Sequence, residues 1–236
     1  MSRTLAIAVE TFPIAGRFVI SRGAKTQARV VVATIADGAV RGRGECVPYA
    51  RYGESVESVV AQIESARAAI EAGADRAALQ DLAPAGAARN ALDCALWDFD
   101  AKRLGVPASL LAGLHRLAPA TTAYTISVGT PEEMAQAAAR AAERPLLKIK
   151  LAGEGDAARL RAVRAAAAEA TLIVDANEAW DEADLAAHFA VCVETGVTLI
   201  EQPLPAGRDA ALARAPRPIP VCADESVHDR HGLEAL

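Results

Sequence analysis

Charged side chains close four short apolar runs in the second half of the chain. These side chains are Lys148 with Lys150, Asp175, Glu201 and Asp224. They recur in steps of about 25 residues, a length that suits one strand, one helix and two short loops of a parallel β/α barrel. In that fold the carboxyl ends of neighbouring strands surround one mouth of the barrel. The spacing therefore predicts three carboxylates beside two amines, a combination typical of a metal-dependent enzyme.

The residue types at these positions indicate a particular chemistry. Lys148 and Lys150 should point to one face of their strand, because side chains alternate along it. Two neighbouring ammonium groups and a nearby cation should lower the lysine pKa toward values useful for a base. Asp175, Glu201 and Asp224 offer the hard oxygen ligands that suit Mg²⁺. Such an ion can bind a substrate carboxylate and stabilise the enediolate that forms when the α-proton leaves.

Each carboxylate taken alone has a simpler explanation. An acid that follows an apolar strand often caps the next helix, and lysines on either side of an isoleucine often mark only a strand end. Four such positions in register with the barrel repeat are much less easily explained in this way. The pattern as a whole therefore favours a metal site.

Strands and helices alternate from about residue 118 onward, as in a β/α barrel. Helices should begin at Pro131 and near His228. The predicted strands are Tyr124–Val128, Leu146–Leu151, Leu172–Asp175, Leu199–Glu201 and Val221–Asp224. Because a closed barrel needs eight strands, we expect an incomplete TIM-type (β/α) barrel and a C-terminally truncated chain, a fragment. The alternative is a genuine five-stranded sheet that stops there.

The first part of the chain has a different organisation. Residues 1–117 should form an α+β domain, and residues 118–236 the partial barrel with the metal site. Asp37-Gly38 predicts a hairpin turn, and the stretch from Gly42 to Tyr49 is predicted as a loop. The predicted strands and helices of this part are Thr4–Glu10, Ala28–Ile35, Ser55–Ala72 with Ser55 as its N-cap, and Ala87–Leu104.

Composition excludes several classes of function. The 236 residues carry a net charge of −5, and no local basic cluster offers a surface for nucleic acid. No apolar run is long enough for a membrane span, and Arg3 and Glu10 interrupt any signal peptide. The four cysteines lie far apart without metal-like spacing, so they are predicted to be reduced and buried. A cytoplasmic enzyme fits these observations.

Four short strings around the charged positions resemble the enolase superfamily, in its muconate-lactonizing branch. The resemblance spans the whole chain and implies that residues 1–117 are a capping domain over the barrel mouth. In this superfamily a lysine base works beside Mg²⁺, which stabilises the enediolate. The strings are Leu147-Lys148-Ile149-Lys150, Val174-Asp175-Ala176-Asn177, Ile200-Glu201-Gln202-Pro203 and Ala223-Asp224-Glu225-Ser226.

Within this branch the sequence looks most like the dipeptide epimerases of the L-Ala-D/L-Glu type. The strings that support this are Gly44-Glu45-Cys46-Val47-Pro48-Tyr49, Arg51-Tyr52-Gly53-Glu54-Ser55, and Tyr124-Thr125-Ile126-Ser127-Val128 followed by Pro131-Glu132-Glu133.

The resemblance implies roles for individual residues. Lys150 would be one acid/base, and Lys148 would help to stabilise the enolate. Thr125 and Arg22 match positions that touch substrate. The Mg²⁺ ligands would be Asp175, Glu201 and Asp224.

Three further residues lie beside the predicted metal ligands. Asn177 and Glu225 are candidates to hydrogen-bond them, although Asn177 could equally cap the next helix. Gln202 precedes Pro203, which predicts extended geometry and a role in shaping the turn.

The chain departs from the epimerase pattern in one respect. An epimerase of this kind needs a second lysine on the sixth barrel strand and an acidic pair after the eighth, and neither segment is within these 236 residues. We therefore expect the chain as given to lack epimerase activity. The expected substrate is a small dipeptide, such as those released from peptidoglycan, and the resemblance suggests a homo-oligomer.

Other functions remain open. The alternatives within the same fold are muconate cycloisomerase, o-succinylbenzoate synthase and N-acylamino-acid racemase. A non-catalytic remnant is an alternative of another class.

Overall fold

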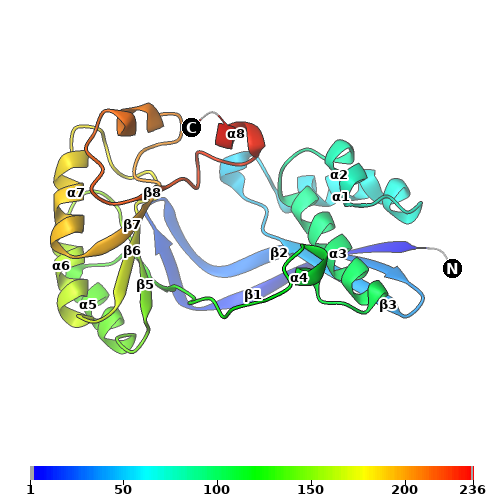
Figure 1. The fold of residues 1–236 in the computed structure, drawn as a ribbon, viewed down its shortest axis with the longest axis horizontal. Helices are drawn as coiled ribbons and strands as arrows, with labels where there is room; N and C mark the ends of the chain where they lie inside the picture. Colours follow the sequence, from blue (N-terminus) through cyan, green and yellow to red (C-terminus); the bar gives the residue numbers. More distant parts are fainter. Residues whose placement is uncertain (1–2, 235) are drawn as a thin grey trace. The chain divides into compact units, whose positions relative to one another are not determined.

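The computed structural model describes residues 3–234 and 236 and divides the chain into two compact units. The first unit contains the residues up to Ala15 and Thr26–Pro119, and the second contains Gly16–Lys25 and Ala120–Leu236. Each unit has its own sheet, with three strands in the first and five in the second (Figure 1).

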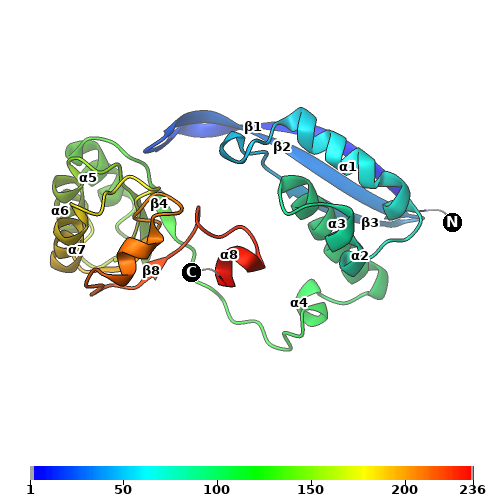
Figure 2. The same cartoon turned by 90° about the horizontal axis from the view of Figure 1, so that it is seen from above.

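The first unit packs helices against an antiparallel sheet in the order β1-β2-β3 (Figure 2). Asp37 pairs with Val40, which confirms the predicted hairpin turn between β2 and β3. Its core is apolar and includes Val59 and Ile63 of α1 and Leu92 of α3. The elements are β1 (Thr4–Ile20), β2 (Gly23–Asp37), β3 (Val40–Cys46), a 3-10 turn η1 (Ala50–Tyr52), α1 (Val56–Glu71), α2 (Arg76–Leu82), α3 (Ala87–Leu104) and α4 (Ala108–Leu111).

The prediction of a loop is wrong for residues 42–46, which belong to β3, and is confirmed for residues 47–49. Gly42 and Gly44 lie against α3, where a side chain would not fit. A Cβ added at Gly44 would lie 2.0 Å from the carbonyl oxygen of Ala91. Glycine at these positions therefore allows the strand to approach the helix backbone closely.

The predicted cap of α1 is confirmed. The hydroxyl of Ser55 accepts a hydrogen bond from the amide of Ser58, and the hydroxyl of Ser58 accepts one from the amide of Ser55. Two amide groups at the helix start thus gain partners, as in the usual capping box, but with serine in place of the acid.

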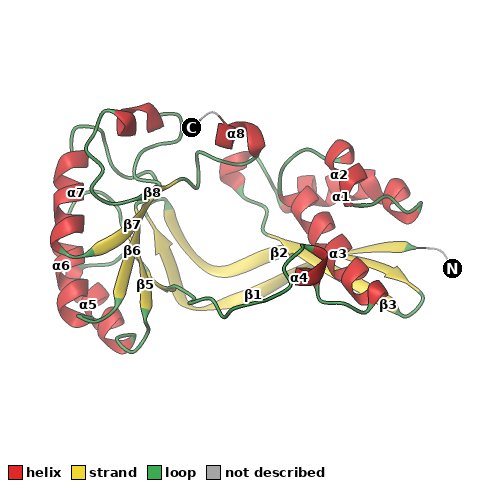
Figure 3. Cartoon of the chain, in the orientation of Figure 1, coloured by secondary structure: helices red, strands yellow, loops and turns green. Residues whose placement is uncertain are grey.

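Strands and helices alternate along the second unit, as predicted, and all five strands are parallel (Figure 3). Each predicted strand is present, although β4 and β8 end two residues earlier than expected. Within the described residues the sheet does not close into a barrel. The elements are β4 (Tyr124–Ile126), α5 (Pro131–Arg140), β5 (Leu146–Lys150), α6 (Asp156–Ala166), β6 (Thr171–Asp175), α7 (Leu185–Glu194), β7 (Val197–Glu201), a 3-10 turn η2 (Asp209–Ala213), β8 (Val221–Cys222) and α8 (Arg230–Glu234).

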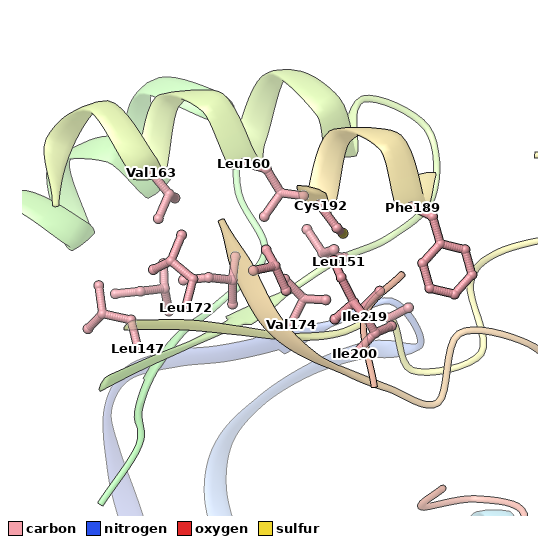
Figure 4. Packing of buried hydrophobic residues seen from close by; sticks show 14 of the residues in the cluster. Leu147, Leu151, Leu160, Val163, Leu172, Val174, Phe189, Cys192, Ile200 and Ile219 are labelled. Atoms are coloured by element: carbon pink, nitrogen blue, oxygen red, sulfur yellow. The ribbon is translucent and has the colours of Figure 1, made fainter. Parts of the chain in front are cut away.

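One face of this parallel sheet is covered by α5, α6 and α7. Ile149, Val174 and Ile200 point into this layer and have no exposed surface. Together with Leu160 and Val163 of α6 they form part of one buried apolar cluster (Figure 4). Burying each side chain of this kind contributes about 1.5–3 kcal/mol. Since side chains alternate along a strand, the neighbouring lysine and carboxylate positions must lie on the opposite face.

The tip of the β1–β2 hairpin, Gly16–Lys25, is part of the second unit. The amide of Val128 donates to the carbonyl oxygen of Val19 at 3.1 Å, and the amide of Val19 donates to the hydroxyl of Ser127 at 3.3 Å. These bonds hold Arg22, at the turn of the hairpin, on the unit that carries the charged residues.

The cysteines are all free, as predicted, but only two of them are buried. Cys46 and Cys192 lie in the cores, whereas Cys94 and Cys222 are exposed. The expectation of burial is wrong for Cys94, and for Cys222, which lies on the last strand of the sheet. In the described part of the chain, no helix has the length and apolar character needed to cross a membrane.

Candidate active site

Strand register brings the charged residues into one row. Lys150, Asp175 and Glu201 are the last residues of β5, β6 and β7. Lys150 pairs with Asp175, Asp175 with Glu201, and Glu201 with Cys222. Residues paired in parallel strands point to the same face. These four side chains therefore lie side by side across four strands, on the face opposite the helices.

Both lysines contact the carboxylates of this row. Lys150 Nζ is 2.5 Å from Asp175 Oδ2. Lys148 Nζ contacts the same oxygen at 3.0 Å and both oxygens of Glu201 at 2.6 and 2.7 Å. Thr125 pairs with Lys148 on the neighbouring strand β4. The structure thus brings together Lys148, Lys150, Asp175 and Glu201, with Thr125 beside them.

The expected lowering of the lysine pKa is wrong for Lys148. Burial lowers the pKa of Lys148, but its hydrogen bonds to Glu201 and Asp175 outweigh this effect and leave the pKa raised. The prediction considered the neighbouring ammonium group and a nearby cation, whereas each ammonium group here faces a carboxylate of opposite sign. Lys148 is therefore held in its protonated form.

The carboxylates differ in their protonation behaviour. Burial opposes the charge of Asp175, but hydrogen bonds from Lys150 and Lys148 leave its pKa lowered. The pKa of Glu201 is raised by burial, and that of the exposed Asp224 by partial loss of solvent and by the charges of Glu225 and Asp175. A bound cation would relieve the repulsion among the carboxylates of Asp175, Glu201 and Asp224. These oxygen donors therefore suit a hard divalent ion.

A complete metal-binding group is not formed among residues 3–234 and 236. No three histidine, cysteine, aspartate or glutamate side chains there lie close enough together to hold an ion. Asp224 lies two residues beyond the end of β8, and Lys148 lies between Asp175 and Glu201. The three predicted ligands supply the right oxygen chemistry. Binding of an ion would require Lys148 to give up part of its contacts.

A line of hydrogen bonds connects Lys150 to the hairpin tip. Lys150 Nζ donates to Asn177 Oδ1 at 3.1 Å, and Asn177 Nδ2 donates to Glu225 Oε1 at 3.2 Å. Arg22 Nη2 donates to the same oxygen of Glu225 at 2.6 Å, and Arg22 Nη1 donates to the carbonyl oxygen of Asn177 at 2.8 Å. Asn177 and Glu225 are buried. Asn177 does not cap the next helix, because α7 begins at Leu185.

The sequence indicated no part in the site for Glu178, and only a role in shaping the turn for Gln202. Glu178 forms an ion pair with Arg22 at 2.9 Å and accepts a hydrogen bond from the amide of Ala206. Gln202 is buried and has φ of 35°, rather than the extended geometry predicted before a proline. Asn177 and Glu178 also have positive φ, at 45° and 67°. Such strained conformations cluster at functional sites, but no sequence pattern indicated them.

Comparison with known families identifies the two halves of the chain. Residues 2–113 match the mandelate racemase/muconate lactonizing enzyme N-terminal domain, and residues 132–236 match the enolase C-terminal domain-like family. The chain belongs to the enolase superfamily, in its mandelate racemase/muconate lactonizing group.

Two characterised relatives are racemases or epimerases. The L-Ala-D/L-Glu epimerase of Escherichia coli (strain K12) is 47% identical over 99% of this chain, which spans 74% of the relative. The N-acetyl-D-glutamate racemase of a Pseudoalteromonas species is 40% identical over 88% of this chain, and the match spans 66% of that protein. The chain thus matches two thirds to three quarters of the length of these relatives.

Solved structures of similar proteins contain dipeptides. An enolase family member from Agrobacterium tumefaciens, with homology to dipeptide epimerases and with bound sodium and L-Ala-L-Glu, superposes with a TM-score of 0.96 at 51% identity, over 99% of this chain and 72% of its own. A dipeptide epimerase from Methylococcus capsulatus, complexed with Mg and L-Arg-D-Lys, has a TM-score of 0.89 at 30% identity, over 100% of this chain and 72% of its own. Over the part that it shares with these structures, the chain therefore has their enolase-family fold.

Proposed function

We propose that this chain carries the Mg²⁺ site and one acid/base lysine of a dipeptide epimerase of the L-Ala-D/L-Glu type. The main support is the row of Lys150, Asp175 and Glu201 at adjacent strand ends, in a chain 47% identical to such an epimerase. In this proposal Asp175, Glu201 and Asp224 hold Mg²⁺. When bound, the ion stabilises negative charge that develops on the substrate carboxylate.

Lys150 and Lys148 have different parts in the proposed reaction. Lys150 removes or returns the α-proton on one face of the substrate, and Asp175 and Asn177 hold its amine in place. Once Lys150 has taken the proton, its ammonium group has the Asp175 carboxylate as its partner. Lys148 keeps its proton, because its pKa is raised, and lends positive charge beside the developing enolate.

Arg22 and Thr125 are the proposed substrate contacts. The side chain of Arg22 is 28% exposed and lies on the same unit as Lys150, through its bonds to Asn177 and Glu225. A guanidinium group held in this way can pair with a substrate carboxylate. Thr125 lies beside Lys148 and can offer a hydroxyl hydrogen bond. A cytoplasmic location and a homo-oligomeric state stay predictions.

Exchange of the α-proton tests this function. L-Ala-L-Glu and L-Ala-D-Glu are incubated in D₂O with Mg²⁺, with either the 236-residue chain or the product of its complete reading frame, and the glutamate α-proton is followed by NMR. With Lys150 as the single base, the 236-residue chain should exchange at most one epimer and should not interconvert the two. Interconversion requires a second base on the other face. If neither the 236-residue chain nor the product of the complete reading frame exchanged the α-proton of any dipeptide, the proposed epimerase function would be contradicted.

Racemisation of an N-acylated amino acid is the second candidate. The Pseudoalteromonas N-acetyl-D-glutamate racemase, at 40% identity, favours it. N-acetyl-L-glutamate and N-acetyl-D-glutamate differ from the dipeptide in lacking its ammonium group. A higher rate with these compounds than with L-Ala-L-Glu in the same exchange assay would favour this candidate.

A further inference from the structure

The side-chain amide of Gln202 connects the segments that follow β7 and β8. Its Oε1 accepts hydrogen bonds from the amides of Asp224 at 2.9 Å and Ser226 at 3.1 Å. Its Nε2 donates to the carbonyl oxygen of Leu204 at 2.9 Å and to the hydroxyl of Ser226 at 2.8 Å. The side chain is buried, so both ends of the amide are satisfied inside the protein.

These bonds fix the segment after β8, whose described residues have no strand pairing of their own. The pairing of β7 with β8 contains only Ile200 with Val221 and Glu201 with Cys222. Asp224 lies two residues beyond this ladder and is exposed. The hydrogen bond from its amide to Gln202 therefore helps to fix the backbone of Asp224.

Gln202 also follows Glu201 directly, so one residue links two of the proposed metal ligands. Its own amide donates to the carbonyl oxygen of Cys222 at 2.8 Å. Its φ of 35° is costly for a residue with a side chain. The buried hydrogen bonds of the side chain offset that cost and keep the amide aimed at the segment after β8.

Asp209 determines which way the amide of Gln202 faces. The hydroxyl of Ser226 donates to both oxygens of Asp209, at 2.9 and 2.8 Å, and therefore accepts the bond from Gln202 Nε2. Asp209 Oδ1 also lies 3.4 Å from Gln202 Nε2. With Nε2 directed at Asp209 and Ser226, Oε1 must face the amides of Asp224 and Ser226.

We propose that Gln202 is a positioning residue for a divalent cation, because it fixes the backbone of Asp224 relative to Glu201. Asp209 and Ser226 support it by orienting its amide. The inference rests on the proposed function, in which Asp224 and Glu201 bind the same ion. It assigns a purpose to a residue that is neither a proposed metal ligand nor a proposed substrate contact.

Binding of Mn²⁺ to the full-length protein, followed by electron paramagnetic resonance, tests this inference. Gln202→Met keeps the shape of the side chain but removes its hydrogen bonds, and it should weaken Mn²⁺ binding by about 10- to 100-fold. Turnover at saturating metal should recover in part, because the ion, once bound, restores the site. Ser226→Ala is the milder variant and should weaken binding by a smaller factor. It serves as the test if Gln202→Met does not fold.

Asp156→Ala is the matched control. Asp156 is buried and accepts hydrogen bonds from the amides of Ala152 and Gly153, so it also holds a loop by two backbone amides, but in a loop without a proposed ligand. The control should lower the melting temperature and leave the Mn²⁺ affinity unchanged. Equal Mn²⁺ binding by wild type, Gln202→Met and Ser226→Ala would overturn the inference and leave the proposed function intact. If Asp156→Ala weakened Mn²⁺ binding as much as Gln202→Met does, the inference would also be overturned. Failure of the wild type to bind Mn²⁺ would overturn both.

Discussion

The two lysines of β5 are chemically identical but lie in different surroundings. Lys150 is buried against Asp175 and the side chain of Asn177, whereas Lys148 is half-buried and bridges Asp175 and Glu201. Burial lowers the pKa of Lys148, but its hydrogen bonds to Glu201 and Asp175 leave this pKa raised, so Lys148 is suited to keep its proton. This difference supports Lys150 as the residue that exchanges protons.

Replacement of Lys150 by arginine separates proton transfer from charge. Arginine can still pair with Asp175, but it does not deprotonate in proteins. We expect Lys150→Arg to lower α-proton exchange from one glutamate epimer by at least about 100-fold, with little change in melting temperature. Exchange is measured by NMR in D₂O on the full-length protein. Lys150→Ala should lose exchange as well and also lose stability, because it leaves Asp175 buried with one partner fewer. Retention of exchange in Lys150→Arg would exclude Lys150 as the base.

At the scale of the elements, close approach of β3 to α3 depends on glycine. The Cβ of an alanine at Gly44 would lie 2.0 Å from the carbonyl oxygen of Ala91 and 2.5 Å from the amide of Ala95. Because backbone atoms cannot move aside as a side chain can, Gly44→Ala should lower the free energy of unfolding by at least about 2 kcal/mol. Urea denaturation measures this value.

Gly232→Ala is the matched control, since the nearest atom to its added Cβ is at an ordinary distance of 3.5 Å. It should change stability by less than about 0.5 kcal/mol. Equal free energies of unfolding for Gly44→Ala and Gly232→Ala would mean that β3 can move away from α3 without loss of stability.

The sequence predicted the elements whose ends carry a strong local signal. Helix α3 was predicted from end to end, because apolar residues recur on one side and Gly105 stops it. The strands β4 to β8 were predicted because each apolar run stands between turn residues. The extent of β3 beyond the hairpin turn was missed, because Gly42 and Gly44 indicate a loop when their contacts with α3 are unknown.

The candidate site was predictable only in part. Positions at successive strand ends indicated Lys150, Asp175 and Glu201, because register follows from parallel pairing. The raised pKa of Lys148 was not predictable, since it depends on which charges lie nearest in space. The contacts of Gln202 with Asp209 and Ser226 join residues 7 and 24 positions away, and no spacing rule indicates such partners.

At the scale of the whole molecule, a cation bound by the native state alone should stabilise it. With Mg²⁺ at about 100 times its dissociation constant, the gain is about 2.7 kcal/mol. We expect the melting temperature to rise with added Mg²⁺ and to fall again with EDTA, as measured by calorimetry. Glu201→Gln should remove most of the rise. An equal rise in this variant would show that the ion binds elsewhere.

Alkaline pH should reduce stability through Cys192, which lies buried in α7. Burial raises the pKa of this thiol from 9.0 to about 12, and the charge of Asp156 adds to the effect. A group with a raised pKa in the folded state binds its proton more tightly there than in the unfolded chain. The stability from this difference is fully present below about pH 9 and is lost as the pH rises toward 12.

Comparison with Cys192→Ala isolates this contribution. Each unit of pKa shift corresponds to about 1.4 kcal/mol, so the loss can approach about 4 kcal/mol by pH 12. Cys46, with its pKa raised to about 11 by burial, destabilises both proteins alike as the pH rises. Urea denaturation at pH 8 and at pH 10.5 should therefore show a smaller pH effect in Cys192→Ala than in the wild type. Parallel losses in the two proteins would mean that the Cys192 thiol ionises no later in the native state than in the unfolded chain.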